Sequence, residues 1–365
     1  MCLKASGRPR KWITVPDMRS ILINGRPVGS GHPCFVIAEP GSNHNGSLET
    51  ALKLIDVAAD AGADAVKFQT FRAEDHYVRK TPQFSYLRDL HPDVSTFELI
   101  KRNEMPRSWH AVLKSHAEKR GIMFLSTPSD RAAVDELVDQ HGMAAIKIAS
   151  FEAVDLSFID YCARKGKPLI VATGMCSLGD VEDILATTQR AGNPDVVLLH
   201  CVSLYPTQPD QVNLRAMQTL EGAFGLPVGL SDHTLGIEVP LAAVALGACV
   251  IEKHYTLDRT LSGPDHPFAI EPDELKAMVA GIRKVQQALG TPLKRQLPEE
   301  AEMARLGRRS ITTRVPIPQG TVITSEMLVA KRPGYGIAPK FLPLLIGRTA
   351  RRTIEADEVV TWEMV

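Results

Sequence analysis

The segment FVIAEPGSNHNGSLETALKLIDVAADAGADAVKFQT, residues 35–70, contains one complete strand–helix–strand repeat. Its two ends, Phe35–Glu39 and Ala65–Gln69, are short apolar runs typical of buried parallel strands. Between them, Ser47 is a suitable N-cap, apolar residues recur at positions 48, 52, 55 and 59, and Gly62 can end a helix. This spacing predicts an amphipathic helix that connects two parallel strands.

The same repeat continues along the chain as far as Gly290. Further runs with strand character are Ile122–Ser126, Ala145–Ala149, Leu169–Thr173, Val196–Cys201, Val228–Ser231 and Cys249–His254. Each is followed by a helix-like segment, and the last helix is expected to begin at Pro272 and stop at Gly290. Eight such repeats over roughly 250 residues predict an α/β protein with a closed (β/α)₈ TIM barrel.

Segments of different texture flank the barrel, which we assign to residues 34–290. Residues 1–33 are predicted to be a tail, over residues 1–18, and a hairpin with Asn24-Gly25 as its turn, which could cover the bottom of the barrel. Residues 291–307 are charged and contain Pro292 and Pro298, so they are predicted to be a linker. Residues 308–365 are short apolar pieces split by turn signals, which predicts a small, mostly-β domain. Such a domain buries little core, so we expect it to lean on the barrel or on another chain.

The overall composition excludes several classes of partner. The 365 residues carry 42 Lys+Arg and 42 Asp+Glu, so neither nucleic acid nor an anionic membrane is expected as a partner. No apolar run reaches the roughly 20 residues of a membrane helix, and no secretory signal pattern is present, which predicts a cytoplasmic protein. The six cysteines are scattered singly, which predicts buried thiols rather than a disulfide framework or a zinc cluster.

Polar residues are numerous at the ends of the predicted strands. Barrel enzymes carry their catalytic groups at the rim where strands end and loops begin. The polar residues expected at this rim are Glu39, Asn43, His44, Lys67, Gln69, Ser126, Thr127, Lys147, Ser150, Glu152, Thr173, His200, Ser203, Tyr205, Ser231, Asp232, His233, Glu252, Lys253 and His254. A purely stabilising role would not require so many polar groups on one rim, so we expect an active site there.

Two lysines, Lys67 and Lys147, lie inside apolar strand runs. A bare ammonium group there would cost several kcal/mol, so each lysine requires an anionic partner. One interpretation is a pocket for a phosphate or a carboxylate, and the other is a structural ion pair with Glu39 or Glu252. The hydroxyl groups that could complete such a pocket are those of Ser126, Thr127 and Ser150. Glu152, close to Lys147 in sequence, is either a general acid or base or a salt-bridge partner of that lysine.

His233 and His254 end two consecutive predicted strands, so their imidazoles can converge on one point. Two nitrogen ligands with open positions suit a divalent metal ion. The oxygen-rich surroundings, with Glu39, Asp232 and Asp265, favour Mn²⁺ or Mg²⁺ over a closed zinc site. The alternative is a pair of hydrogen-bonded core histidines.

Several motifs in a fixed order resemble the sialic acid synthases, the N-acetylneuraminate synthase family. They are FVIAEPGSNHNG (35–46), AVKFQT (65–70), STP (126–128), HC (200–201) followed by YP (205–206), GLSDHT (229–234), IEKH (251–254) and GPD (263–265). In addition, KRPG (331–334) resembles the antifreeze-protein-like SAF domain of that family. The resemblance covers about residues 20–365 and implies a TIM barrel followed by a SAF domain.

The resemblance implies a transferase that forms a carbon–carbon bond. In this family phosphoenolpyruvate condenses with an open-chain, N-acylated mannosamine-type sugar, which gives a nine-carbon 2-keto acid and phosphate. By resemblance, His233 and His254 bind a divalent metal that polarises the sugar aldehyde, with Mn²⁺ expected and Mg²⁺ as the alternative. The residues that the resemblance places against phosphoenolpyruvate are Lys67, Gln69, Thr127, Lys147, Ser150, Ser203 and Ser231.

The resemblance also implies roles for residues around the sugar. Glu39 would orient metal-bound water or sugar hydroxyls, and Glu152 would either protonate the aldehyde oxygen or deprotonate the attacking water. Together with Lys147, these two carboxyl groups form the expected catalytic set. Asp265 and Tyr205 would contact the sugar. Arg332 would reach the N-acyl group from the small domain of a partner subunit, which implies a domain-swapped homodimer.

Several positions depart from the family pattern, among them an expected Asn that is missing around residues 91–95 and Leu306 at the N-acyl pocket. Ala172 stands where the family often has Ser, Ser203 where it often has Asn, and Phe151 where it commonly has Gly. These departures leave two alternatives beside a sialic acid synthase. One is the same chemistry on a 6-deoxy-diacetamido sugar, as in legionaminic and pseudaminic acid synthases, and the other is a non-catalytic relative that binds phosphoenolpyruvate or a sugar. A zinc hydrolase built on the two histidines would leave the two lysines without a use.

Overall fold

The computed structural model describes residues 20–90 and 93–365. The chain divides into two compact units, one that ends at Gly290 and one that covers Thr291–Val365. The predicted tail over residues 1–18 lies outside the described residues. Among the helices of the described residues, none combines the length and the apolar character needed to cross a membrane.

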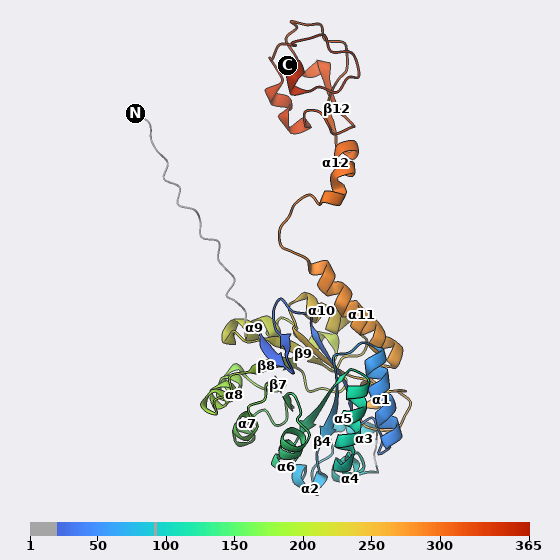
Figure 1. Ribbon diagram of the computed structural model, residues 1–365. Coiled ribbons are helices and arrows are strands. Elements are labelled where there is room, and N and C mark those ends of the chain that lie inside the picture. Colours follow the sequence, from blue (N-terminus) through green and yellow to red (C-terminus); the bar gives the residue numbers. More distant parts are fainter. Residues whose placement is uncertain (1–19, 91–92) are drawn as a thin grey trace, which may run out of the picture. The chain divides into compact units, whose positions relative to one another are not determined.

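The first unit is built on parallel strands that form a nearly closed barrel (Figure 1). The strands are β3 (Phe35–Gly41), β4 (Ala65–Thr70), β5 (Met123–Pro128), β6 (Ile146–Ile148), β7 (Leu169–Ala172), β8 (Val196–Cys201), β9 (Val228–Asp232) and β10 (Val250–His254). They pair in the order β5-β4-β3-β10-β9-β8-β7-β6, which brings the first and last predicted strands together. The ends of this order, β5 and β6, lie side by side, but no ladder joins them in the described part of the chain. The predicted TIM barrel is therefore confirmed.

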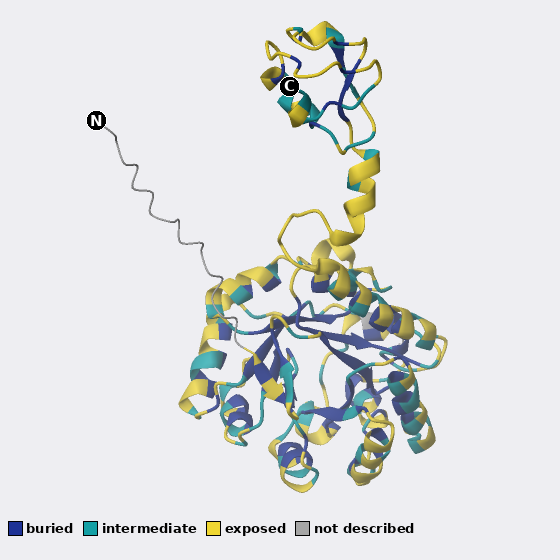
Figure 2. Ribbon diagram, turned by 45° about the horizontal axis from the view of Figure 1, so that its top comes forward, coloured by how far each residue is buried: buried dark blue, intermediate teal, exposed yellow. Residues whose placement is uncertain are grey.

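Helices surround these strands and turn their apolar faces inward, so that the strands are buried and the outer helix faces are exposed (Figure 2). The main helices are α1 (Leu48–Asp60), α5 (His110–Lys119), α6 (Arg131–Asp135), α7 (Leu156–Ala163), α8 (Leu178–Arg190), α9 (Ala216–Phe224), α10 (Glu238–Ala245) and α11 (Pro272–Leu289). A π-helical turn, η2 (Glu136–Gln140), follows α6 directly. Short helices in the connections are α2 (Ala73–His76), α3 (Ser85–Leu90), α4 (Thr96–Arg102), η1 (Arg107–Trp109), η3 (Pro209–Gln211) and η4 (His266–Phe268).

Helix α1 begins and ends where the sequence predicts. The hydroxyl of Ser47 accepts a hydrogen bond from the backbone of Thr50, and Gly62 has a positive φ of 79°. Its most deeply buried residues are Ala51, Leu54, Ile55 and Ala58, whereas Leu48, Leu52 and Ala59 lie at the edge of the buried stripe.

The predicted hairpin is present and covers the N-terminal end of the barrel. Strands β1 (Ile21–Ile23) and β2 (Arg26–Val28) are antiparallel, and Asn24 and Gly25 form the turn with positive φ angles of 50° and 76°. The guanidinium of Arg26 lies 5.2 Å from the ring centre of Phe35, at the start of β3. The apolar side chains that join the barrel core are those of Ile21, Ile23 and Val28.

One carboxylate, that of Asp64, connects several elements at this end of the barrel. It accepts hydrogen bonds from the backbone of Val36 and from Arg283 of α11, each at 2.7 Å, and it pairs with Arg26 of the hairpin. Its side chain is only 10% exposed, so these charge-assisted bonds replace water almost completely.

The second unit is small and has its own core. Strands β11 (Ser310–Thr313) and β12 (Leu328–Lys331) are antiparallel, with short helices η6 (Ser325–Met327), η7 (Pro339–Leu344) and η8 (Trp362–Met364). Before them, η5 (Pro298–Glu300) and α12 (Ala301–Gly307) occupy the second half of the predicted linker. The backbone of Gly334 donates to the carbonyl of Arg305 at 2.7 Å, so α12 is attached to this unit. The core residues are Ile311, Ile317, Ile323, Leu328, Ile337, Leu345, Ala350, Ile354, Val360 and Val365.

The cysteines of the described residues are free thiols, as predicted. Cys34, Cys162, Cys201 and Cys249 are buried, and Cys176 is half-buried. Burial raises the pKa of the Cys249 thiol to about 12, so this thiol is inert at neutral pH.

We expect Asp64→Ala to lower the free energy of unfolding by about 2–4 kcal/mol, because it leaves two guanidinium groups and a buried amide without their acceptor. Urea denaturation followed by circular dichroism measures this change. Asp60→Ala is the control, since Asp60 pairs with Arg120 at the surface and its side chain is 74% exposed. That control should change stability by less than about 0.5 kcal/mol. Similar losses in both variants would contradict a special role for Asp64.

Candidate active site

A cavity of about 620 Å³ opens at the C-terminal ends of the barrel strands. All residues of the first unit to which the family resemblance assigns a role line it: Glu39, Lys67, Gln69, Thr127, Lys147, Ser150, Glu152, Ser203, Tyr205, Ser231, His233, His254 and Asp265. Arg332 belongs to the second unit, where it is exposed and its Nε donates to the carbonyl of Gly307 at 2.7 Å. The structure thus brings the barrel residues together, while their individual roles remain predictions.

Other rim residues named from the sequence do not line this cavity. The hydroxyl of Ser126 lies 2.8 Å from that of Thr70, and Asp232 is paired with Lys253. His200 Nε2 lies 2.6 Å from the carbonyl oxygen of Val212. The expectations that Ser126 belongs to an anion pocket and that Asp232 surrounds a metal are therefore wrong. Side chains alternate along a strand, so these residues point away from the faces that carry their cavity-lining neighbours.

Lys67 of β4 is almost fully buried within a hydrogen-bonded network. Its Nζ lies 2.6 Å from Glu39 Oε1, donates to Thr127 Oγ1 at 2.8 Å and lies 3.8 Å from Glu252 Oε2. The amide of Gln69 donates to the same Glu39 oxygen at 3.0 Å. The ammonium group is therefore both paired with carboxylates and presented to the cavity.

Lys147 of β6 shares one of these carboxylates. Its Nζ lies 3.5 Å from Glu252 Oε1, which also accepts a hydrogen bond from Ser231 at 3.1 Å. Burial opposes ionisation of Glu39, but the positive charges of Lys67 and Lys147 outweigh it and lower the pKa of Glu39 to about 2. Glu39 is therefore an ionised acceptor at neutral pH.

A glycine allows two serines to approach the backbone beside Lys147. Ser150 Oγ accepts a hydrogen bond from the backbone of Gly174 at 3.0 Å. A Cβ atom on Gly174 would lie 2.4 Å from Ser203 Oγ and 2.7 Å from Ser150 Oγ, closer than real contacts allow. Ser203 Oγ is buried and has no hydrogen-bond partner among the described residues. This hydroxyl is consequently free to bind an anionic group of a ligand.

The two predicted metal ligands face one another. The ring centres of His233 and His254 lie 5.5 Å apart, and the ring of Tyr205 lies 4.4 Å from that of His233. His233 Nδ1 donates to the carbonyl of Val202 at 2.9 Å, which leaves Nε2 as its ligand atom. His254 Nε2 lies 3.7 Å from Glu39 Oε2, and its buried Nδ1 has no hydrogen-bond partner in the described part of the chain.

Asp265 lies beside this histidine pair. A Cβ atom on Gly41, which has a φ of 54°, would lie 3.1 Å from Asp265 Oδ2 and 3.4 Å from His254 Cε1, so the glycine permits this close approach. Ser42 Oγ donates to the same carboxylate at 3.3 Å. Nitrogen donors from two histidines beside the oxygen donors of Glu39 and Asp265 fit a divalent metal ion. The metal assignment stays a prediction.

Glu152 lies above the anion end of the cavity in a mostly dry position. Its side chain is 12% exposed, its Oε1 lies 3.7 Å from His76 Nε2, and its Oε2 has no hydrogen-bond partner among the described residues. Burial raises the pKa of Glu152 to about 7, although Lys147 opposes the shift. A carboxyl group with this pKa can give or take a proton at neutral pH.

The sequence did not reveal His76 as a cavity residue. It ends the four-residue helix α2 and packs on Phe71, with ring centres 6.2 Å apart. A helix of one turn has no periodicity to detect, so only the tertiary packing shows that His76 faces Glu152.

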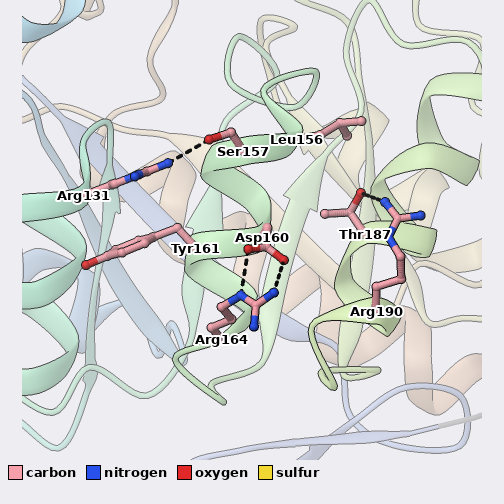
Figure 3. Close-up of a pocket in the computed structure, with 8 residues that line it drawn as sticks. All are labelled: Arg131, Leu156, Ser157, Asp160, Tyr161, Arg164, Thr187 and Arg190. Atoms are coloured by element: carbon pink, nitrogen blue, oxygen red, sulfur yellow. Dashed lines mark hydrogen bonds and ion pairs between the residues drawn. The ribbon is translucent and has the colours of Figure 1, made fainter.

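A second hollow lies on the outside of the barrel along α7 and α8 (Figure 3). Its charged groups already have partners: Arg131 donates to Ser157 at 2.7 Å, Arg164 pairs with Asp160 and Arg190 donates to Thr187 at 2.9 Å. Because these arginines are paired with neighbouring side chains, the barrel cavity is the better candidate for an active site.

The sequence model of the NeuB family matches residues 54–294, and that of the SAF domain matches residues 308–365. The chain therefore belongs to the NeuB family of nonulosonic acid synthases, and it is a phosphoenolpyruvate-condensing enzyme. This finding confirms the resemblance drawn from the sequence motifs.

Relatives of this chain cover nearly its whole length. It is 42% identical over 349 residues to the N,N'-diacetyllegionaminic acid synthase of Legionella pneumophila, covering 94% of this chain and 98% of that protein. It is 37% identical over 348 residues to the N-acetylneuraminate-9-phosphate synthase of Homo sapiens, covering 94% and 96%. The crystal structure of a spore coat polysaccharide biosynthesis protein from Bacillus subtilis matches with a TM-score of 0.65 at 38% identity, covering 95% of this chain and 99% of that one.

We expect the stability of the wild type to fall relative to that of Glu152→Gln as the pH rises. The folded protein keeps the Glu152 proton up to about pH 7, whereas an unfolded chain releases it near pH 4.5. The stabilisation is complete below the unfolded value and is lost as the pH passes through the folded value, at most about 3 kcal/mol. Urea unfolding of both proteins at pH 5 and pH 8 measures this difference. Identical pH dependences would contradict the raised pKa.

Proposed function

We propose that the enzyme condenses phosphoenolpyruvate with an open-chain, N-acylated mannosamine-type sugar to form a nine-carbon sialic acid and phosphate. The observation that carries this proposal is the composition of one cavity. Lys67 and Lys147 line it together with serine hydroxyls and with His233 and His254. An anionic enol ester and a sugar aldehyde can thus be held next to each other.

The anion end of the cavity suits phosphoenolpyruvate. The ammonium groups of Lys67 and Lys147 and the free hydroxyl of Ser203 are available for its carboxylate and phosphate. The other side chains that we assign to it are those of Gln69, Thr127, Ser150 and Ser231. Because the two lysines are held by buried carboxylates and Ser150 is held by the backbone, little reorganisation is needed when the substrate binds.

The reaction forms one carbon–carbon bond and breaks one carbon–oxygen bond. The enol electron pair of phosphoenolpyruvate attacks the aldehyde carbon through C3, and the aldehyde oxygen takes up a proton. Water then adds to C2 with loss of a proton. The C2–O bond to phosphate breaks as the new C2 hydroxyl becomes the ketone, and its proton leaves with the inorganic phosphate. Glu152, with a pKa of about 7, serves one of these proton transfers. A divalent metal, Mn²⁺ or Mg²⁺, held by His233 and His254 would supply polarisation of the aldehyde.

One feature of the cavity favours a second candidate, a 6-deoxy-diacetamido sugar. Part of the wall is apolar and consists of Phe71, Phe84, Leu87, Ile100, Phe151 and Met175. A methyl group in place of a hydroxymethyl group would bury its surface there without leaving a hydroxyl unpaired. The Legionella relative, 42% identical, is a legionaminic acid synthase by name.

The substrate is tested by phosphate release from phosphoenolpyruvate with a panel of amino sugars, including N-acetylmannosamine and a 6-deoxy-diacetamido sugar. We expect release with at least one sugar and divalent metal. His233→Ala should reduce the metal-dependent rate at least about 100-fold. His116→Ala is the control, because His116 pairs with Asp56 on the outside of the barrel at 2.8 Å. Binding of phosphoenolpyruvate without release with any sugar would contradict catalysis and support a binding protein.

We further propose that the second unit completes the site of a partner subunit in a domain-swapped homodimer. Arg332 is exposed, and its side chain is held by the end of α12, so it is available for contact with another chain. Its guanidinium can donate to the carbonyl of an N-acyl group.

We expect Arg332→Ala to raise the KM for the sugar about tenfold or more, while the dissociation constant for phosphoenolpyruvate changes less than about twofold. Steady-state kinetics and calorimetry measure these quantities, and light scattering measures the dimer. Arg352→Ala is a matched control, since Arg352 pairs with Glu358 within the same unit. A monomer, or equal effects of the two variants, would contradict the swapped arrangement.

A further inference from the structure

Three side chains that can hold a metal ion, His110, Glu136 and His141, lie together outside the active-site cavity. Their ligand atoms all lie within 4.8 Å of one another. His110 Nδ1 lies 2.7 Å from Glu136 Oε1, and His141 Nε2 lies 3.7 Å from the same oxygen. We propose that this cluster binds one divalent transition-metal ion, with Zn²⁺ as the best match. The proposal does not depend on the function proposed above.

The backbone brings two of the ligands together through an unusual turn. Glu136 begins the π-helical turn η2, and the backbone N–H of His141 donates to the carbonyl of Glu136 at 3.0 Å. In an α-helix, residues five apart point about 140° away from each other. The wider turn instead places Glu136 and His141 on the same side. Turns of this kind are rare in proteins overall, but where they occur they are often found at functional sites.

The third ligand, His110, is held in place by a hydrogen bond through its other ring nitrogen. His110 is the first residue of α5 and is fully buried, and its Nε2 lies 3.0 Å from the hydroxyl of Thr70. With its proton on Nε2, the ring donates to Thr70 and leaves Nδ1 for the metal, as is usual for histidine ligands.

The carboxylate is also oriented. Arg107 NH1 lies 3.7 Å from Glu136 Oε2, and Arg107 NH2 donates to Asp130 at 2.7 Å. The arginine thus lies near one carboxylate oxygen, while Oε1 is the oxygen that faces the histidines. Since the charges of Arg107 and Asp130 offset each other, the cluster keeps the single negative charge of Glu136 for a cation.

The types of ligand atom and their exposure to solvent indicate which metal ion the cluster would bind. Two nitrogens and one oxygen suit zinc, whereas calcium and magnesium prefer oxygen ligands alone. Tetrahedral zinc places its ligand atoms about 3.3 Å apart, and the two distances to Glu136 Oε1, 2.7 and 3.7 Å, lie on either side of this value. The Glu136 and His141 side chains are 16% and 21% exposed, so an ion can enter and water can fill a fourth position.

The test is zinc binding to the full chain, measured by competition with a chromogenic chelator and by thermal unfolding. In the His233→Ala/His254→Ala protein, which lacks the predicted active-site ligands, we expect about one saturable zinc ion per chain and a higher melting temperature with zinc. Adding His141→Ala should weaken this binding at least about tenfold and remove the thermal shift. His116→Ala is the matched control, because His116 and His141 are both half-buried. We expect this variant to bind zinc as the parent protein does.

Two results would overturn the proposal. One is the absence of saturable zinc binding in the His233→Ala/His254→Ala protein, and the other is binding that survives both His141→Ala and Glu136→Gln. Should the double variant fail to fold, the same comparison is made in the wild type. There, His141→Ala must lower the zinc stoichiometry by one ion per chain, and an unchanged stoichiometry would equally exclude the site.

Discussion

The cavity end of the barrel depends on one constraint: two buried ammonium groups must each be paired with a carboxylate. Lys67 lies 2.6 Å from Glu39, and Glu252 lies between Lys67 and Lys147. Removing any one of these charges would leave another uncompensated in a dry environment, which costs several kcal/mol. Because the four charges cancel, an anionic substrate gains little net attraction from them alone. A cation at the neighbouring histidines would therefore assist its binding as well as its reaction.

The strands could be predicted closely from the sequence because buried parallel strands are continuous apolar runs, and their ends differ from the structure by one or two residues. The face of each strand was harder to assign. Ser126 and Asp232 stand next to true cavity residues, Thr127 and His233, and only the alternation of side chains separates them. The contact of His76 with Glu152 could not be predicted, because it joins elements distant in sequence. The π-helical turn η2 was not predicted either, since no pattern found in the sequence indicates it.

Membership of the NeuB family establishes the reaction class, whereas the sugar depends on local features of the wall. The named relatives at 42% and 37% identity act on different sugars by their names, so overall similarity does not distinguish them. Phe151 is 50% exposed and lines the cavity next to Glu152. Phe151 thus places a bulky apolar side chain beside a carboxyl group that is itself only 12% exposed.

The Asp64 cluster joins the hairpin, β3 and α11 at the ends of the strands opposite the cavity. The Asp64 cluster and the candidate active site thus lie at opposite ends of the same barrel. Loops at the cavity end can change during evolution, or be exchanged in the laboratory, without disturbing the Asp64 contacts at the other end of the barrel. New sugar specificities could on this basis evolve through successive substitutions at the rim, because the opposite end of the barrel remains unchanged and keeps the fold stable.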